Sequence, residues 1–406
     1  MARWLARIAL FAFTLLLLEL GLHGAARISH RVAYVLASPW ERDEPAVADA
    51  RMGYVGNPLK MDHDRDGYRN ADVPPKVDVV VFGDSQSYGV GVAREDAWPS
   101  VLAELSNLRV YNMALPGHGP ANAALQLESA LRMQPRHLLV GVYFGNDLFD
   151  GFALSRSNPD VARHVPPDLG RRAEELELQA PLTFGFGTLF QDEEKSQTQG
   201  VDGLSPQRLL SRHSALYGLL RSLRARLDTP AQSSAVLARD FGIASAALDD
   251  ARLAWFSPFD SGNGWRTILT GRYRARVMDL GDPRLAAGLE IALASLAAVE
   301  RVARAKDAQL LVVLVPTKEF VFGPRVADPE RHVGLVDLLE RETALRTALT
   351  EQLALAGIPV LDLTVVLRAQ NENPYFEDVD GHPNPRGHAA IARAVLERLG
   401  NRHALQ

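Results

Sequence analysis

Short apolar stretches alternate with longer amphipathic stretches through most of this chain. The apolar stretches are rich in β-branched residues, which is typical of buried strands; they lie at residues 78–82, 109–113, 138–144, 310–315 and 359–363. The amphipathic stretches predict helices at residues 94–106, 120–133, 284–306, 335–356 and 386–399. Apolar strands separated by helices indicate a mostly parallel sheet that is covered on both faces. The pattern therefore predicts an α/β fold.

The first 30 residues show a different pattern. Arg3 and Arg7 precede the apolar run 8–18, and the apolar character continues past Glu19. The run alone is shorter than the roughly 20 residues that a membrane span needs, but its extension over residues 4–26 is long enough. A signal anchor is favoured over a cleaved signal peptide, and both predict export of the remaining chain.

Two stretches interrupt the alternation. Residues 31–75 form an irregular leader, and residues 151–275 form a long helical or irregular insert with no clear strand. Inserts of this length are uncommon unless they form lids or binding surfaces. The predicted organisation is an anchor over residues 1–30, the leader, and one domain over residues 76–406 that carries the insert.

The leader contains one motif that resembles a metal site. Residues 62–67, Asp-His-Asp-Arg-Asp-Gly, match the first half of a calcium-binding loop. The twelfth position is Val73 instead of Glu, so the bidentate ligand is missing. A polar surface turn is therefore favoured, and no metal site is predicted.

Composition narrows the classes of function. The 406 residues carry a net charge of -5 and contain no cysteine. The acidic balance argues against a general nucleic-acid-binding protein. The absence of cysteine excludes disulfides, thiolate metal sites and a cysteine nucleophile.

Four polar segments follow predicted strands or precede the final helix. Three of them follow strands and contain Ser85, Gly117 and Asn146, and the fourth, residues 378–384, contains His382. The carboxyl ends of parallel strands share one edge of a sheet, where such folds bind ligands. We therefore expect Ser, Gly, Asn and His to meet at one site.

These residue types suit acyl transfer. Ser85 would become a nucleophile if His382 removed its proton, and a neighbouring carboxylate would hold the imidazole in the required tautomer. The backbone N–H groups of Ser85 and Gly117 and the side-chain amide of Asn146 are candidate donors to an oxyanion. Asp84 is expected to be structural, accepting backbone hydrogen bonds in its turn.

The four blocks, in this order, resemble the SGNH (GDSL-type) hydrolase superfamily over about residues 77–150 and 305–400. The resemblance implies a three-layer α/β/α sandwich with a five-stranded, flavodoxin-like parallel sheet, and neither a metal nor an organic cofactor. The site residues that it implies are Ser85 as nucleophile, His382 as base, Asp380 as acid, and Ser85, Gly117 and Asn146 as the oxyanion hole. The N-terminal helix and the segment 315–319 resemble, more loosely, membrane-anchored members that act on bacterial surface polysaccharides.

The acid position departs from the pattern of the superfamily. The common last block is Asp-x-x-His, but a valine stands where the aspartate is expected. Asp380 is favoured over Asp378, and Asp362 at the end of the last strand is a third alternative. His388 is an alternative base, although it falls inside a predicted helix.

Other polar and aromatic residues could border the site. Lys318 and Glu319 follow the fourth strand at the same edge, where a surface ion pair is favoured over contact with a substrate. Trp255, Phe256 and Trp265 in the insert are candidate sugar platforms, with core aromatics of a small lid as the alternative.

The sequence therefore predicts a serine esterase that acts through an acyl-serine on O-acyl, chiefly O-acetyl, esters of a carbohydrate. The same triad would serve an O-acyltransferase, and a non-catalytic polysaccharide-assembly scaffold is the alternative of another class. A nucleotide-binding protein is disfavoured because a glycine-rich phosphate loop is missing. The expected partners are the ester substrate, the membrane and polysaccharide-assembly proteins, without nucleic acid. The expected location is the cell inner membrane, crossed once, with the catalytic domain in the periplasm.

Overall fold

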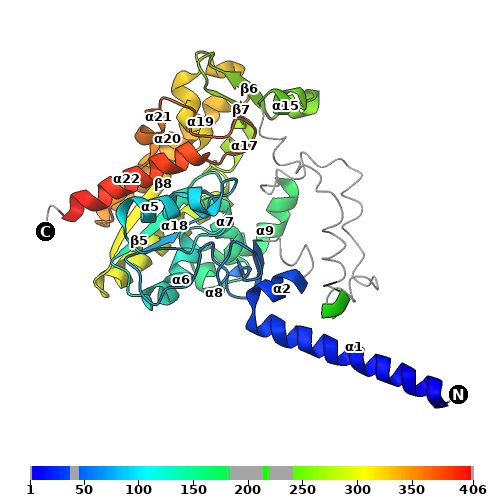
Figure 1. Ribbon diagram of the computed structural model, residues 1–406. Helices are drawn as coiled ribbons and strands as arrows, with labels where there is room; N and C mark the ends of the chain where they lie inside the picture. Colours follow the sequence, from blue (N-terminus) through cyan, green and yellow to red (C-terminus); the bar gives the residue numbers. More distant parts are fainter. Residues whose placement is uncertain are drawn as a thin grey trace. The chain divides into compact units, whose positions relative to one another are not determined.

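The computed structural model describes residues 2–36, 45–180 and 241–403, together with residues 182, 214–217 and 219 (Figure 1). The chain divides into two compact units. The first comprises Met1–Val47, Gly56–Asp72 and Gly185–Ser233, and the second Ala48–Val55, Val73–Phe184 and Ser234–Gln406.

The first unit begins with a long apolar helix, α1 (Ala2–Ile28), followed by α2 (His30–Leu36). The span Arg3–Ile28 has a mean hydropathy of 2.0, and α1 is long and apolar enough to cross a membrane. A signal sequence has the same length and composition, so α1 is a candidate for either role. Its one acidic residue, Glu19, accepts a hydrogen bond from the backbone N–H of Leu216 at 3.0 Å.

Residues 62–70 of this unit form a compact polar turn. Arg69 Nε donates to the carboxylate of Asp62 at 2.6 Å. Asp64 accepts hydrogen bonds from two backbone N–H groups and from the Asn70 side chain. Donors of the turn itself thus bond both carboxylates. The sequence favoured a polar surface turn, and the segment is a polar turn in which His63 and Asp64 are buried.

The second unit is built around a five-stranded parallel sheet with the order β4-β3-β5-β8-β9. Its strands are β3 (Val79–Phe82), β4 (Val110–Asn112), β5 (His137–Tyr143), β8 (Gln309–Val315) and β9 (Val360–Asp362). The predicted α/β fold and all five predicted strands are confirmed. Since β4 lies on one side of β3 and β5 on the other, the strand order reverses between β3 and β5, and such switch points are where these sheets bind ligands.

Helices cover both faces of the sheet, which gives three layers (Figure 1). α5 (Trp98–Ser106) and α22 (Pro385–His403) pack together on one face, and α6 (Pro120–Leu131) and α18 (Pro283–Arg304) pack together on the other. These four helices and α20 (Leu335–Leu355) correspond to the five predicted helices.

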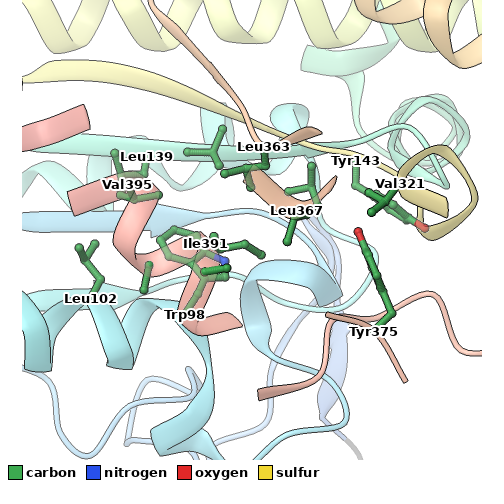
Figure 2. Close-up of a cluster of buried hydrophobic side chains, with 14 of the residues drawn as sticks. Trp98, Leu102, Leu139, Tyr143, Val321, Leu363, Leu367, Tyr375, Ile391 and Val395 are labelled. Carbon is green, nitrogen blue, oxygen red and sulfur yellow. The ribbon is translucent and has the colours of Figure 1, made fainter. Parts of the chain in front are cut away.

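The core on the first face explains why these segments pack. Trp98 of α5 and Ile391 of α22 are fully buried beside Leu139 of β5 (Figure 2). Successive side chains of a strand point to opposite faces, so Val79 and Val81 join this cluster. Burial of each large aliphatic side chain stabilises the fold by roughly 1.5–3 kcal/mol.

The other described elements are mostly short. The helices are α4 (Ser85–Tyr88), α7 (Asp147–Ser155), α8 (Pro159–Ala162), α9 (Pro167–Gln179), α15 (Phe241–Ala246), α16 (Asp250–Leu253), α17 (Gly271–Arg276), α19 (Lys318–Phe322) and α21 (Thr364–Arg368). Single 3₁₀ turns are η1 (Arg94–Asp96), η2 (Gly323–Arg325) and η3 (Pro329–Arg331), and β1 (Ala46–Asp49) and β2 (Gly53–Gly56) form a two-stranded sheet. The leader, predicted to be irregular, thus contains most of α2 and both of these strands.

The insert contains a β-hairpin that the sequence pattern did not indicate. β6 (Ser257–Asp260) pairs antiparallel with β7 (Arg266–Leu269), and the backbone N–H of Ser261 closes the turn by donating to Trp265 O at 3.0 Å. The prediction of an insert without strands is therefore wrong. Each strand has only four residues, and Pro258 interrupts the apolar alternation on which strand prediction depends. Most of residues 181–240, the middle of the insert, lie outside the described residues.

Candidate active site

Ser85 is the first residue of α4, directly after β3. Asp84 caps this helix, because its Oδ1 accepts a hydrogen bond from the backbone N–H of Gln86 at 2.9 Å. Gly83 has a φ of +148°, and a Cβ there would lie 2.7 Å from Ser87 Oγ, so the turn requires glycine. Ser85 is partly exposed, whereas the residues on both sides are buried. The tight turn thus presents a single accessible hydroxyl, and Asp84 has the structural role that was predicted.

His382 is held by Asp380. Its Nδ1 hydrogen-bonds to Asp380 Oδ1, and its backbone N–H donates to the same oxygen at 3.1 Å. Its Nε2 is buried and has no hydrogen-bond partner within the described residues. Gln86 Nε2 donates to Gly381 O at 3.4 Å, which joins the loop of His382 to the turn of Ser85. The histidine therefore has one nitrogen fixed and one available, on a loop that adjoins the serine.

The charge of Asp380 suits this arrangement. Burial alone would raise the pKa of Asp380, but His382 and the nearby ammonium of Lys318 outweigh it and lower the pKa to about 2. Asp380 is therefore ionised at neutral pH and can only accept hydrogen bonds, so the proton on His382 Nδ1 points toward it.

The alternative acids and the alternative base have other contacts. Asp378 Oδ1 accepts the backbone N–H of Asp380 at 2.8 Å, and Asp362 pairs with Arg346. His388 is fully buried, and its Nδ1 accepts the backbone N–H of a tryptophan in α5 at 3.3 Å. Of the residues weighed in the sequence, the structure brings Asp380 to His382 and places the other three in structural roles.

Three groups near Ser85 could donate to an oxyanion. Within the described residues, the backbone N–H groups of Ser85 and Gly117 have no hydrogen-bond acceptor. Gly117 has a φ of +76°, and a Cβ there would lie 2.3 Å from Tyr54 Oη. Asn146 is the N-cap residue of α7 and donates from Nδ2 to Asp150 Oδ2 at 2.5 Å. The same Asp150 oxygen lies 3.7 Å from the Cβ position of Gly117, so the second and third predicted blocks meet at Asp150.

Lys318 has a role that the sequence did not indicate. Its side chain is 0% exposed, and Nζ donates to the backbone oxygens of Ile268, Asp378 and Asp380 at 3.0, 2.7 and 2.9 Å. Glu319 is also 0% exposed and accepts hydrogen bonds from the backbone and side chain of Thr270. The favoured interpretation, a surface ion pair, is therefore wrong. Lys318 ties the loop of Asp380 and His382 to β7, and burial lowers the pKa of Lys318.

Arg274 connects the two halves of the site. It is buried, and its Nη1 donates to Gly145 O at 2.9 Å, one residue before Asn146. A Cβ on Gly381 would lie 2.9 Å from Arg274 Nη2, so the guanidinium also borders the histidine loop. No motif marks this arginine, because it lies in α17 inside the insert, far in sequence from both loops.

A group of buried acids lies behind the serine turn. Burial raises the pKa of Asp84 and of Asp147, and repulsion between the two carboxylates raises that of Asp147 further. Burial and the charge of Asp84 raise the pKa of Asp150 to about 7. Tyr54 faces the same acids, which together with burial raise its pKa, and its Oη donates to Pro116 O at 2.7 Å. Sequence analysis singled out only Asp84 among these groups.

The aromatic residues of the insert do not form a common sugar platform. Phe256 is 0% exposed and Trp265 is 2% exposed, and Trp265 packs edge-on against Phe322 with ring centroids 5.1 Å apart. Both are core aromatics, the alternative named for them, and the hairpin places Trp265 against Phe322 of α19. Trp255 is partly exposed, and the guanidinium of Arg272 lies 4.4 Å from its ring centroid.

A known protein family matches the C-terminal third of the chain. Residues 275–406 match a family described as "SGNH hydrolase-like domain, acetyltransferase AlgX". A solved structure of a protein assigned to the G-D-S-L family of lipolytic proteins, from Desulfitobacterium hafniense DCB-2, is similar, with 12% identity and a TM-score of 0.33 over 80% of this chain and 99% of that one. No curated protein matches the chain.

The family match agrees with the resemblance predicted from the four blocks, and it covers residues 275–406 of the chain. The matched residues contain Asp380 and His382, whereas Ser85, Gly117 and Asn146 precede them in the chain. The family supports acyl-ester hydrolysis or acyl transfer in general.

Proposed function

We propose that this protein is a serine esterase that removes O-acyl groups, chiefly O-acetyl groups, from a carbohydrate. The observation that carries the proposal is the pairing of His382 Nδ1 with Asp380, which leaves Nε2 without a partner among the described residues, on a loop that adjoins Ser85. A serine hydroxyl needs such a base to become a nucleophile. The acetyl group is proposed because the matching family is described as an acetyltransferase.

In the proposed reaction, Ser85 Oγ attacks the ester carbonyl carbon while His382 Nε2 accepts the hydroxyl proton. Asp380 holds the tautomer of His382 and stabilises the imidazolium that forms. The negative oxygen accepts hydrogen bonds from the N–H groups of Ser85 and Gly117 and from the Asn146 amide. His382 then returns the proton to the leaving alcohol, and the acyl group remains on Ser85.

The second half of the reaction decides between two enzymes. Water deprotonated by His382 would release a carboxylic acid and restore Ser85, which makes the protein an esterase. A sugar hydroxyl in the same place would take the acyl group, which makes it an O-acyltransferase. The transferase is the second candidate function, and the description of the matching family favours it. A non-catalytic polysaccharide-assembly scaffold would have no need of the Asp380–His382 pair.

The N-terminal helix indicates where the enzyme would act. With α1 as a single membrane anchor, the second unit would lie in the periplasm at the cell inner membrane. An acylated surface carbohydrate would be within reach there, and polysaccharide-assembly proteins are the proposed partners.

Fluorophosphonate labelling of the full-length protein in detergent, read by intact mass, tests the nucleophile. We expect one adduct on the wild-type protein and none on Ser85→Ala. Ser87→Ala is a matched control and should still be labelled, because Ser87 Oγ is buried and lacks a hydrogen bond in the described part of the chain. A folded wild-type protein without an adduct would contradict the esterase and the transferase together and favour the scaffold.

Product analysis separates esterase from transferase. The wild-type protein, once it is shown to react with the fluorophosphonate, is incubated with p-nitrophenyl acetate, with and without cello-, manno- and xylo-oligosaccharides. An esterase releases nitrophenol and acetate in equal amounts whether or not sugar is present. A transferase releases less acetate than nitrophenol when its acceptor is present, and the difference appears as acetylated sugar by mass.

A further inference from the structure

The side-chain amide of Asn146 is held by one contact. Asn146 and Asp150 are one helical turn apart at the start of α7, and the backbone N–H of Asp150 donates to Asn146 O at 2.9 Å. Their side chains therefore lie on the same face of the helix. The 2.5 Å bond from Nδ2 to Asp150 Oδ2 is the one hydrogen bond that the Asn146 side chain makes within the described residues. An amide has two N–H donors, so the second stays available.

The partner in this bond is itself fixed in place. Asp150 is partly buried, and the oxygen that accepts from Asn146 borders Gly117. Tyr54 Oη lies at the same Cβ position of Gly117 and donates to Pro116 O. The amide of Asn146, the carboxyl of Asp150 and the backbone of Gly117 therefore form one packed group, and Asp84, the residue before Ser85, is near enough to raise the pKa of Asp150.

We propose that Asp150 is a positioning residue, which fixes the Asn146 amide so that its second N–H faces the oxygen of the reacting carbonyl. This inference rests on the proposed function, since it concerns the oxyanion hole of that reaction. Asp150 touches no reacting atom and acts through Asn146 alone. A donor that is already oriented needs no reorganisation during the reaction, which is why preorganised donors stabilise an oxyanion well.

The geometry predicts different effects for the two simplest variants of Asp150. In Asp150→Ala the acceptor is gone, and the Asn146 amide is free to rotate. In Asp150→Asn a carbonyl oxygen of the same shape accepts the same hydrogen bond. We expect Asp150→Ala to lower kcat about 10–100-fold with KM changed less than about twofold, because loss of one oxyanion donor costs about 10²–10³-fold. Asp150→Asn should stay within about threefold of the wild-type protein.

A double-mutant cycle tests the coupling. The Asp150→Ala change is made in the wild-type protein and in Asn146→Ala, and kcat for p-nitrophenyl acetate is measured in detergent for all four proteins. If Asp150 acts through Asn146, its removal changes kcat less than about twofold in the Asn146→Ala background. The same 10–100-fold loss in both backgrounds would overturn the proposal. Thermal midpoints of the four proteins exclude simple unfolding as the cause.

A second measurement does not depend on activity. The full-length protein is labelled with ¹⁵N-asparagine, and the Asn146 side-chain amide signal is assigned by its absence in Asn146→Ala. We expect two well-separated amide protons in the wild-type protein and in Asp150→Asn, and their convergence in Asp150→Ala. If the two amide proton signals of Asn146 stay unchanged in Asp150→Ala, the positioning role is refuted. Absent fluorophosphonate labelling together with signals that depend on Asp150 would instead refute the proposed function and leave the contact standing.

Discussion

The two sides of the site have opposite electrostatics. On the histidine side, His382 and Lys318 hold the pKa of Asp380 at about 2, so this carboxylate keeps its charge. On the serine side, burial raises the pKa of Asp84, Asp147 and Asp150, which favours their neutral forms. The difference follows the proposed reaction, because an imidazolium forms beside Asp380 and a negative oxygen forms near Asn146. An ionised acid stabilises the first, and acids that carry less negative charge repel the second less.

The two sides are also supported differently. Ser85 and Asn146 follow the ends of β3 and β5, so the backbone of the sheet places them. The loop of Asp380 and His382 has no regular structure of its own, and side chains from elsewhere hold it, above all Lys318. The serine side should therefore tolerate loss of single side-chain contacts better than the histidine side.

The largest expected effect concerns the ionised acid. Asp380→Asn keeps the shape of the side chain but can hold the wrong tautomer of His382, so kcat should fall about 10³–10⁴-fold. Asp378→Asn is the matched control, because its carboxylate accepts the backbone N–H of Asp380 beside His382. It should lower kcat about tenfold or less. Steady-state kinetics with p-nitrophenyl acetate measures both, and a larger loss in Asp378→Asn would reverse the choice of acid.

Loss of the buried ammonium is the next largest effect. Lys318→Met leaves three backbone carbonyl oxygens and Glu319 without their cation. We expect a loss of about 3–5 kcal/mol in the free energy of unfolding and strongly reduced activity. Lys306→Met, at an exposed position, is the control and should change the stability by less than about 0.5 kcal/mol. Urea unfolding measures both, and equal stabilities would mean that Lys318 does not hold the loop.

The same contrast explains what the sequence could predict. Strands and strand-end residues such as Ser85 and Asn146 follow local patterns, so the apolar runs and the turns after them predicted the sheet and its edge. Lys318 and Arg274 act through contacts with segments remote in sequence, and no local pattern reports such contacts. The buried Trp265 was equally ambiguous, because the hairpin that buries it has strands too short to be recognised.

A smaller effect on stability is expected on the serine side, where the backbone of Gly117 lies close to Tyr54 Oη. Gly117→Ala forces a side chain into a left-handed conformation and against Tyr54 Oη, which should cost about 1–3 kcal/mol of stability. The nearest Tyr54 ring carbon lies 3.6 Å from the added Cβ, so removal of the hydroxyl relieves the contact. Gly117→Ala combined with Tyr54→Phe should therefore be more stable than the sum of the single changes predicts. Additive losses in thermal unfolding would mean that backbone strain alone is responsible.

The smallest expected effect tests the opposite electrostatics directly through pH. The folded pKa of Asp150, about 7, exceeds its ordinary value of 3.8, so its contribution to stability is complete below about pH 3.8 and is lost as the pH rises through 7. Asp150→Asn keeps the hydrogen bond and removes the titration, so the variant should gain about 1–2 kcal/mol relative to the wild-type protein between pH 4 and pH 8, less than the full shift because the carboxyl is partly exposed.

The contribution of Asp380 to stability should change with pH in the opposite direction. Its folded pKa, about 2, lies below 3.8, so its contribution is complete above pH 3.8 and is lost as the pH falls through 2. Asp380→Asn should therefore be destabilised at pH 6, and the difference from the wild-type protein should shrink toward pH 2. Asp160→Asn, at an exposed position, should show neither trend. Free energies of unfolding measured between pH 2 and pH 8 test both predictions. Trends of the same sign for Asp150→Asn and Asp380→Asn would mean that the two sides of the site share one electrostatic environment.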